Sequence, residues 1–108
     1  VINRSLRHQG NPEFWKSLGR MATPERVVFV GLPEEYEGFV SEFNFNCSYF
    51  HSNDCLEMAS MINTAPIFMG NQSLACSVAL GLGKTCFVEE GRSSANYIFP
   101  FRKNAFYI

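Results

Sequence analysis

The strongest structural signal in the sequence is the segment VVFVGLPEEYEGFVSEF, which spans residues 27–43. It begins with a continuous apolar run that closes at Gly31, and such a run is typical of a strand buried on both faces of a parallel sheet. Pro33 then stands where a helix can begin, and the acidic residues behind it favour a helix N-terminus. The apolar side chains that follow have helical spacing, at Tyr36, Phe39, Val40 and Phe43. The segment therefore predicts a strand followed directly by a helix.

The same strand-then-helix unit recurs on both sides of this segment. Apolar runs predict strands at 1–4, 27–30, 47–51, 66–69 and 85–88, and periodic stripes predict helices at 12–22, 33–43, 54–62 and 72–82. Asp54 fits the N-cap of the third helix and Gly83 the end of the fourth. Alternating strands and helices favour a three-layer α/β fold. We therefore predict one Rossmann-like domain over 1–108, with a mainly parallel five-stranded sheet in the order 3-2-1-4-5.

The composition limits the classes of function. The chain has 108 residues, 46% hydrophobic and 18% charged, which excludes disorder as its main state. A formal net charge of -1 gives no global attraction to nucleic acid or to an anionic membrane, and we expect neither as the main partner. No apolar run approaches the roughly 18 residues of a membrane span, and no secretory signal is visible. We therefore expect a cytoplasmic protein without a membrane span.

From the spacing of the residues with reactive side chains, we predict neither a catalytic centre nor a metal site. The cysteines form no C-x-x-C pair and have no metal-ligand spacing with the histidines; they are Cys47, Cys55, Cys76 and Cys86. We expect thiols in a reducing compartment rather than disulfides. The segment GLGKT at 81–85 resembles the end of a phosphate-binding loop, but Val78 stands where that loop needs a glycine. Its lysine also follows a helix, so we interpret it as a helix end.

Polar segments follow three of the predicted strands. The loop after the first strand carries Arg4 and Arg7, whose guanidinium groups suit phosphate or carboxylate recognition. A glycine and three polar residues stand where the fourth strand meets its helix: Gly70, Asn71, Gln72 and Ser73. The glycine permits a close approach of a ligand, Asn71 or Ser73 can cap the helix, and the first-turn N–H groups favour an anion. Glu89 and Glu90 follow the fifth strand, where a carboxylate can accept hydrogen bonds from a ribose.

The predicted strand order connects the first two of these segments. The winding reverses between the first and fourth strands, and ligands of open α/β sheets bind at such a switch point. The loop after residue 4 and the turn at 70–73 would then face each other across one groove and favour a phosphate. Each segment also has an ordinary interpretation, as a solvated basic loop, a capped helix start or a solvated loop end. The sequence leaves both interpretations open.

Several blocks of the sequence resemble one family of enzymes. FVGLPEEYE (29–37), DCLEMA (54–59) and FMGNQSLA (68–75), with VINRS (1–5) and NYIFP (96–100), resemble the C-terminal half of heptosyltransferase-like glycosyltransferases. The resemblance covers nearly the whole chain. It implies the donor-binding, Rossmann-like half of a two-domain GT-B enzyme, whose other half supplies most of the acceptor site and usually the catalytic base.

The resemblance also implies roles for the polar segments. Residues 70–73 would lie near the diphosphate of the donor, with Arg4 and Arg7 facing the same cleft. Glu89 or Glu90 would lie near the ribose or the base. We therefore expect a stand-alone or truncated glycosyltransferase-like domain that binds a nucleotide diphosphate or nucleotide sugar. Without the acceptor half we expect no catalysis, and we expect no cofactor.

The alternative function is a protein-interaction or assembly module that keeps the fold without the ligand. It rests on an aromatic tail with Phe99, Phe101, Phe106 and Tyr107. It also rests on the surface that half of an enzyme would expose, because exposed apolar area commonly marks an interface. In either case we expect a homodimer or a partner domain.

Overall fold

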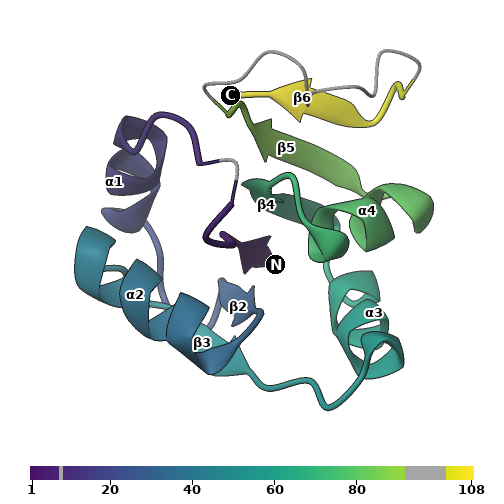
Figure 1. The fold of residues 1–108 in the computed structure, drawn as a ribbon, viewed down its shortest axis with the longest axis horizontal. Coiled ribbons are helices and arrows are strands. Elements are labelled where there is room, and N and C mark those ends of the chain that lie inside the picture. The colour runs from purple at the N-terminus through teal and green to yellow at the C-terminus, as the bar shows by residue number, and fades with distance from the viewer. Residues whose placement is uncertain (8, 92–101) are drawn as a thin grey trace.

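The computed structural model describes residues 1–7, 9–91 and 102–108 (Figure 1). Short strands and helices alternate along them. The strands are β1 (Ile2–Asn3), β2 (Val28–Val30), β3 (Ser48–Phe50), β4 (Ile67–Asn71), β5 (Thr85–Glu89) and β6 (Ala105–Tyr107). The helices are α1 (Glu13–Gly19), α2 (Pro33–Phe43), α3 (Cys55–Asn63) and α4 (Leu74–Gly81).

The strands form one parallel sheet in the order β3-β2-β1-β4-β5-β6. This confirms the predicted α/β class, the parallel sheet and the order of the first five strands. The winding reverses between β1 and β4, where Ile2 pairs with Met69 and Asn3 with Gly70. The carboxyl ends of these two strands therefore meet at the switch point, as predicted.

The sixth strand was not predicted from the sequence. It has three residues, Ala105–Tyr107, at the end of an aromatic-rich tail that shows no clean period. It pairs along β5, with Phe106 opposite Phe87, and the two rings stack with centroids 5.6 Å apart. A strand this short is defined by its neighbour in the sheet, and a local pattern does not reveal it.

Helices cover both faces of the sheet, with α1 and α2 on one side and α3 and α4 on the other (Figure 1). The two sides have separate cores. Neighbouring side chains of a strand point to opposite faces, so Phe29 packs with Trp15 and Phe39 while Val30 packs with Phe68 in the other core. This explains why β2 is a continuous apolar run. The sandwich matches the predicted three-layer, Rossmann-like arrangement.

Short-range interactions start and stop the helices where the sequence indicates. Asp54 is the N-cap of α3 and accepts a hydrogen bond of 2.8 Å from the Glu57 N–H. Ser73 caps α4 by accepting from the Cys76 N–H. Gly83 follows the end of α4 with φ 74, a conformation that favours glycine. Among the described residues, no helix has the length and apolar character to cross a membrane.

The cysteines differ in exposure, which predicts different reactivity. Cys47, Cys76 and Cys86 are buried, whereas Cys55 is exposed at the start of α3. Burial raises the pKa of Cys47 and Cys86 to about 11 and that of Cys76 to about 12, so these thiols stay protonated near neutral pH. We expect iodoacetamide at pH 8 to label one thiol of the folded protein and four in urea, as counted by mass spectrometry. Rapid labelling of two or more thiols in the folded protein would contradict this packing.

Candidate functional site

A cavity of about 370 Å³ lies at the carboxyl edge of the sheet, which we define as the edge where the strands end. It is built from the segments that follow β1, β2, β3 and β4, together with the first turns of α2, α3 and α4. The residues that line it are Asn3, Ser5, Gly31, Leu32, Glu35, His51, Ser52, Asp54, Cys55, Met58, Ser73, Leu74 and Ala75. This position, beside the switch point, is where open α/β sheets bind ligands.

Hydrogen bonds between three elements hold the part of the cavity formed by Asn3. This side chain is buried at the end of β1. Its amide nitrogen donates to the Val30 carbonyl at 2.7 Å, and its amide oxygen accepts from the Ser73 hydroxyl at 2.8 Å. Because Ser73 also caps α4, this chain fixes the ends of β1 and β2 relative to the start of α4.

The first turns of α3 and α4 supply hydrogen-bond donors. In α4 the N–H groups of Cys76 and Ser77 bond to Ser73, whereas those of Leu74 and Ala75 have no hydrogen-bond acceptor among the described residues. In α3 the N–H group of Cys55 is likewise without an acceptor there. Such N–H groups, at the positive end of a helix, bind anionic oxygens well.

Two carboxylates line the cavity as acceptors. One oxygen of Glu35 accepts from the Leu32 N–H at 3.0 Å, and one oxygen of Asp54 accepts from the Glu57 N–H. The second oxygen of each has no hydrogen-bond partner among the described residues. A ligand in the cavity therefore meets N–H donors at two helix starts and carboxylate acceptors that suit hydroxyl groups.

His51 lies at the rim of the cavity, in contact with Tyr49. The Tyr49 hydroxyl donates its one proton to the Gly31 carbonyl at 3.0 Å, so its 3.3 Å contact with His51 Nδ1 requires that nitrogen to be the donor. Burial and the negative charges of the α2 glutamates raise the pKa of Tyr49, which keeps this hydroxyl protonated.

The structure brings Arg4 and Glu89 together, although the sequence predicted that they would contact different parts of a ligand. The two side chains are almost completely buried, and the guanidinium contacts both carboxylate oxygens at 3.0 to 3.3 Å. The same carboxylate accepts from the Gly10 N–H at 2.7 Å and from Trp15 Nε1 at 3.0 Å. Arg4 also bonds to Glu42 at 3.1 Å. The pair thereby ties β1, β5 and the start of α1 together.

Asn71 and Gly70 lie inside the fold at the end of β4. The Asn71 side chain is buried and bonds to the backbone of Ser5 and to the Arg7 carbonyl, which holds the loop after β1. A Cβ atom on Gly70 would lie 2.3 Å from the Asn3 carbonyl oxygen. The glycine therefore permits the close approach of β1.

The remaining predicted residues lie nearer the surface. Arg7 and Glu90 are exposed and Gln72 is half-buried, while Ser73 is the predicted ligand residue that lines the cavity. Phe99 and Phe101 lie outside the described residues. Phe106 is exposed on β6. The ligand-binding roles assigned to these residues from the sequence remain predictions.

No site role was predicted from the sequence for Glu35, His51 or Asp54. The glutamate and the aspartate were interpreted only as helix-start signals, and His51 was predicted at the end of a strand. A usable signal was present, because each lies at or shortly after the end of a predicted strand, and parallel strands end at one edge of the sheet. Which of these side chains line a cavity depends on how the helices pack.

A comparison of the chain with protein-family models, with curated proteins and with solved structures finds no match. Among the described residues, no three histidine, cysteine, aspartate or glutamate side chains are grouped so that they could hold a metal ion.

Proposed function

We propose that the carboxyl-edge cavity binds a nucleotide diphosphate or a nucleotide sugar. The observation that carries this proposal is the cavity itself, which lies beside the switch point and receives the first turns of three helices. The sequence resemblance to the donor-binding half of GT-B glycosyltransferases supports the same ligand class. Transfer of a sugar would need an acceptor site and a base, which in that family come mostly from the other half.

The polar groups suggest how the ligand lies. The unpaired N–H groups of Leu74, Ala75 and Cys55 suit the diphosphate oxygens. The carboxylates of Glu35 and Asp54 suit hydroxyl groups of a ribose or sugar, because an ionised carboxylate only accepts hydrogen bonds. The two exposed leucines at the rim, Leu32 and Leu74, offer apolar contact to a flat base.

Arg4 and Glu89 enter this proposal as the groups that hold the loop after β1. The donors of Arg4 that contact Glu89 are buried, and its Nη1 is engaged by the half-exposed Glu42. A direct contact with phosphate, as the sequence resemblance implies, would require an anion to displace Glu42. Exposed Arg7 needs no such exchange and is the better candidate for a direct contact.

Isothermal titration with nucleoside diphosphates and their sugars tests the proposal. We expect binding by the wild-type protein, and Glu35→Gln or Asp54→Asn should weaken it at least about tenfold, since a hydrogen bond to a charged group contributes about 1.5–3 kcal/mol. Both replacements keep an acceptor for the helix cap. Glu37→Gln, on the exposed face of α2 and outside the cavity, is the control and should bind normally.

Failure of all these ligands to bind at millimolar concentration would end the proposal. Cys55 provides a second readout, because it lines the cavity and is exposed. A ligand in the cavity should slow its reaction with iodoacetamide. A ligand that binds without slowing that reaction lies elsewhere.

The second candidate is a protein-interaction module. The specific observation in its favour is a group of exposed leucines near the carboxyl edge, Leu6, Leu32 and Leu74. Apolar side chains grouped on a surface commonly mark an interface. Under this function the protein would form a homodimer or bind a partner domain without any nucleotide, and light scattering at rising concentration would show the self-association.

A further inference from the structure

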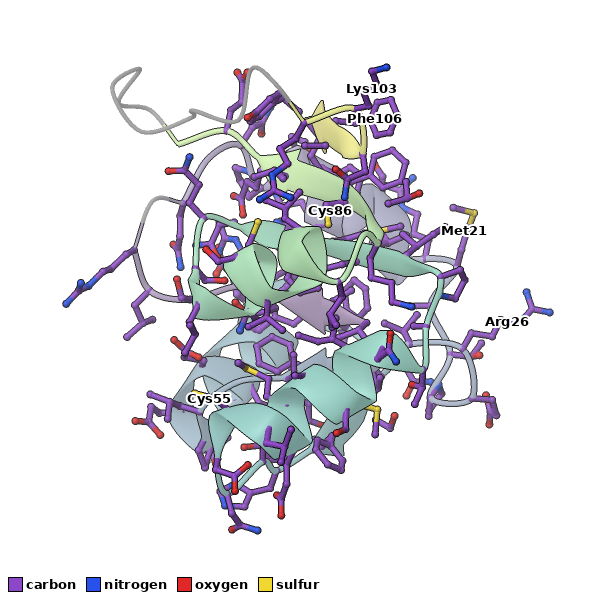
Figure 2. All side chains as sticks on the ribbon, turned by 90° about the vertical axis from the view of Figure 1, so that its right-hand side faces the viewer. Met21, Arg26, Cys55, Cys86, Lys103 and Phe106 are labelled. Carbon is purple, nitrogen blue, oxygen red and sulfur yellow. The ribbon has the colours of Figure 1, made fainter. Side chains whose placement is uncertain are left out.

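The opposite edge of the molecule has a different chemistry. We define the amino edge as the edge where the parallel strands begin. Its described residues include the segment 20–27 before β2, the segment 64–67 at the start of β4, and 82–84 and 102–104 before β5 and β6. Figure 2 shows Met21 and Arg26 projecting on one side of the molecule, while Cys55, from the carboxyl edge, lies toward the other.

Positive charge gathers at the amino edge. Its described residues carry one acidic side chain, Glu25, and five basic ones: Arg20, Arg26, Lys84, Arg102 and Lys103. None of the five forms an ion pair with a described carboxylate. Lys84 and Arg102 instead donate to carbonyls at the ends of α3 and α4, at 2.9 and 3.3 Å. The near-zero net charge of the chain hides this local excess.

Negative charge gathers at the carboxyl edge. The described residues there include five acidic side chains outside the Arg4–Glu89 pair, Glu34, Glu35, Asp54, Glu57 and Glu90, against the exposed Arg7. The two edges therefore carry opposite charge, and the amino edge attracts an acidic partner at a distance.

Apolar side chains lie among the basic ones. Met21 is 73% exposed, Leu82 42% and Ile67 39%. Beside them lies a cavity of about 220 Å³, and Arg26 belongs to its lining with Leu18, Val27, Ala65, Pro66 and Ile67. A concave apolar pocket bordered by a cation accommodates one apolar side chain that has an acidic neighbour.

We propose that the amino edge is a docking surface for an acidic segment of a partner protein. An apolar side chain of that segment occupies the pocket beside Ile67, and its carboxylates contact Arg20, Arg26 and Lys103. A protein segment fits better than a lipid surface, because the pocket is concave. A second copy of this chain fits less well, since contact between its acidic edge and this basic edge is heterologous and builds rings or open filaments rather than the common two-fold dimer.

The test uses a short fluorescein-labelled peptide in which glutamates alternate with leucines, measured by fluorescence anisotropy. We expect the triple variant Arg20→Glu, Arg26→Glu, Lys103→Glu to bind it at least about tenfold more weakly than the wild type. Lys16→Glu reverses one charge on the exposed side of α1, outside the pocket, and should leave the affinity within about twofold. All four positions are exposed, so the variants should fold.

Two control peptides and a vesicle assay separate the alternatives. A peptide with serine in place of leucine should bind more weakly, and so should one with glutamine in place of glutamate. The proposal is overturned if the serine peptide binds equally well, or if the triple variant binds like the wild type. The surface would be assigned to a membrane instead if the wild type sediments with phosphatidylserine vesicles, the triple variant does not, and the wild type does not bind the peptide. Nucleotide titrations of the triple variant should match the wild type, so the two sites can fail independently.

Discussion

Replacing Glu89 with leucine is expected to lower the free energy of unfolding by about 3–5 kcal/mol. The carboxylate is 1% exposed and accepts hydrogen bonds from Arg4, Gly10 and Trp15. Its removal leaves a buried guanidinium with only the half-exposed Glu42 as an ionic partner and two buried N–H groups without an acceptor. A buried charge without its partner costs far more than the ion pair itself contributes. Urea unfolding followed by circular dichroism measures the loss.

The neighbouring residue provides the matched control. Glu90 is exposed, so Glu90→Leu should change the stability by no more than about 0.5 kcal/mol. The double variant Arg4→Met, Glu89→Leu should recover part of the loss, because it removes both buried charges. If Glu89→Leu were as stable as Glu90→Leu, the buried pair would not hold the fold. If the Glu89→Leu variant stayed stable but lost affinity for nucleotides, this result would instead support the role near the ribose that the resemblance implies.

Replacing Gly70 with alanine is expected to cost about 3 kcal/mol. The new methyl group would lie 2.3 Å from the Asn3 carbonyl oxygen and 3.0 Å from the Phe68 ring. Because the first contact is with the backbone of β1, the strands must move apart at the point where the winding reverses. Thermal unfolding should show a fall in Tm of more than about 10 °C for a domain of this size.

An alanine at Gly38 is the control for this variant and should have the opposite effect. Gly38 lies within α2, and a Cβ atom there would meet nothing within 4 Å. Alanine favours a helix over glycine by about 1 kcal/mol, so Gly38→Ala should raise the stability. If the Gly70→Ala variant were as stable as the wild type and lost only ligand affinity, the need for a glycine at this position would come from the close approach of a ligand. The contact with β1 would then not explain it.

Much of the fold could be predicted because its signals are local. The apolar run at 27–30, the acidic start of the next helix and the caps at Asp54 and Ser73 each act over a few residues. The strand order was predicted from the arrangement of doubly wound sheets, and the right-handed crossover rule fixes only which face each helix covers. The edge strand at Ala105–Tyr107 was not predicted, because three residues of an aromatic tail show no periodicity of their own.

The site was harder to predict than the fold. The predicted turn at 70–73 and the candidate cavity lie at the same edge of the sheet and share Ser73. Arg4 and Glu89 have the side chains expected of ligand-binding residues. Their mutual contact, across 85 positions of sequence, changes how each can act. No local sequence pattern distinguishes a carboxylate that is free to bind a ligand from one that is paired with an arginine in the folded protein.

The sequence by itself determined the strands and helices of the first 91 residues and the edge at which polar side chains gather. These features depend on side-chain periodicity and capping, which act within one or two turns of chain. Only the tertiary structure decided the pairing of Arg4 with Glu89, the residues that line the cavity and the separation of charge between the two edges. Each of these depends on distances between segments far apart in the chain, and those distances are set by strand order and helix packing.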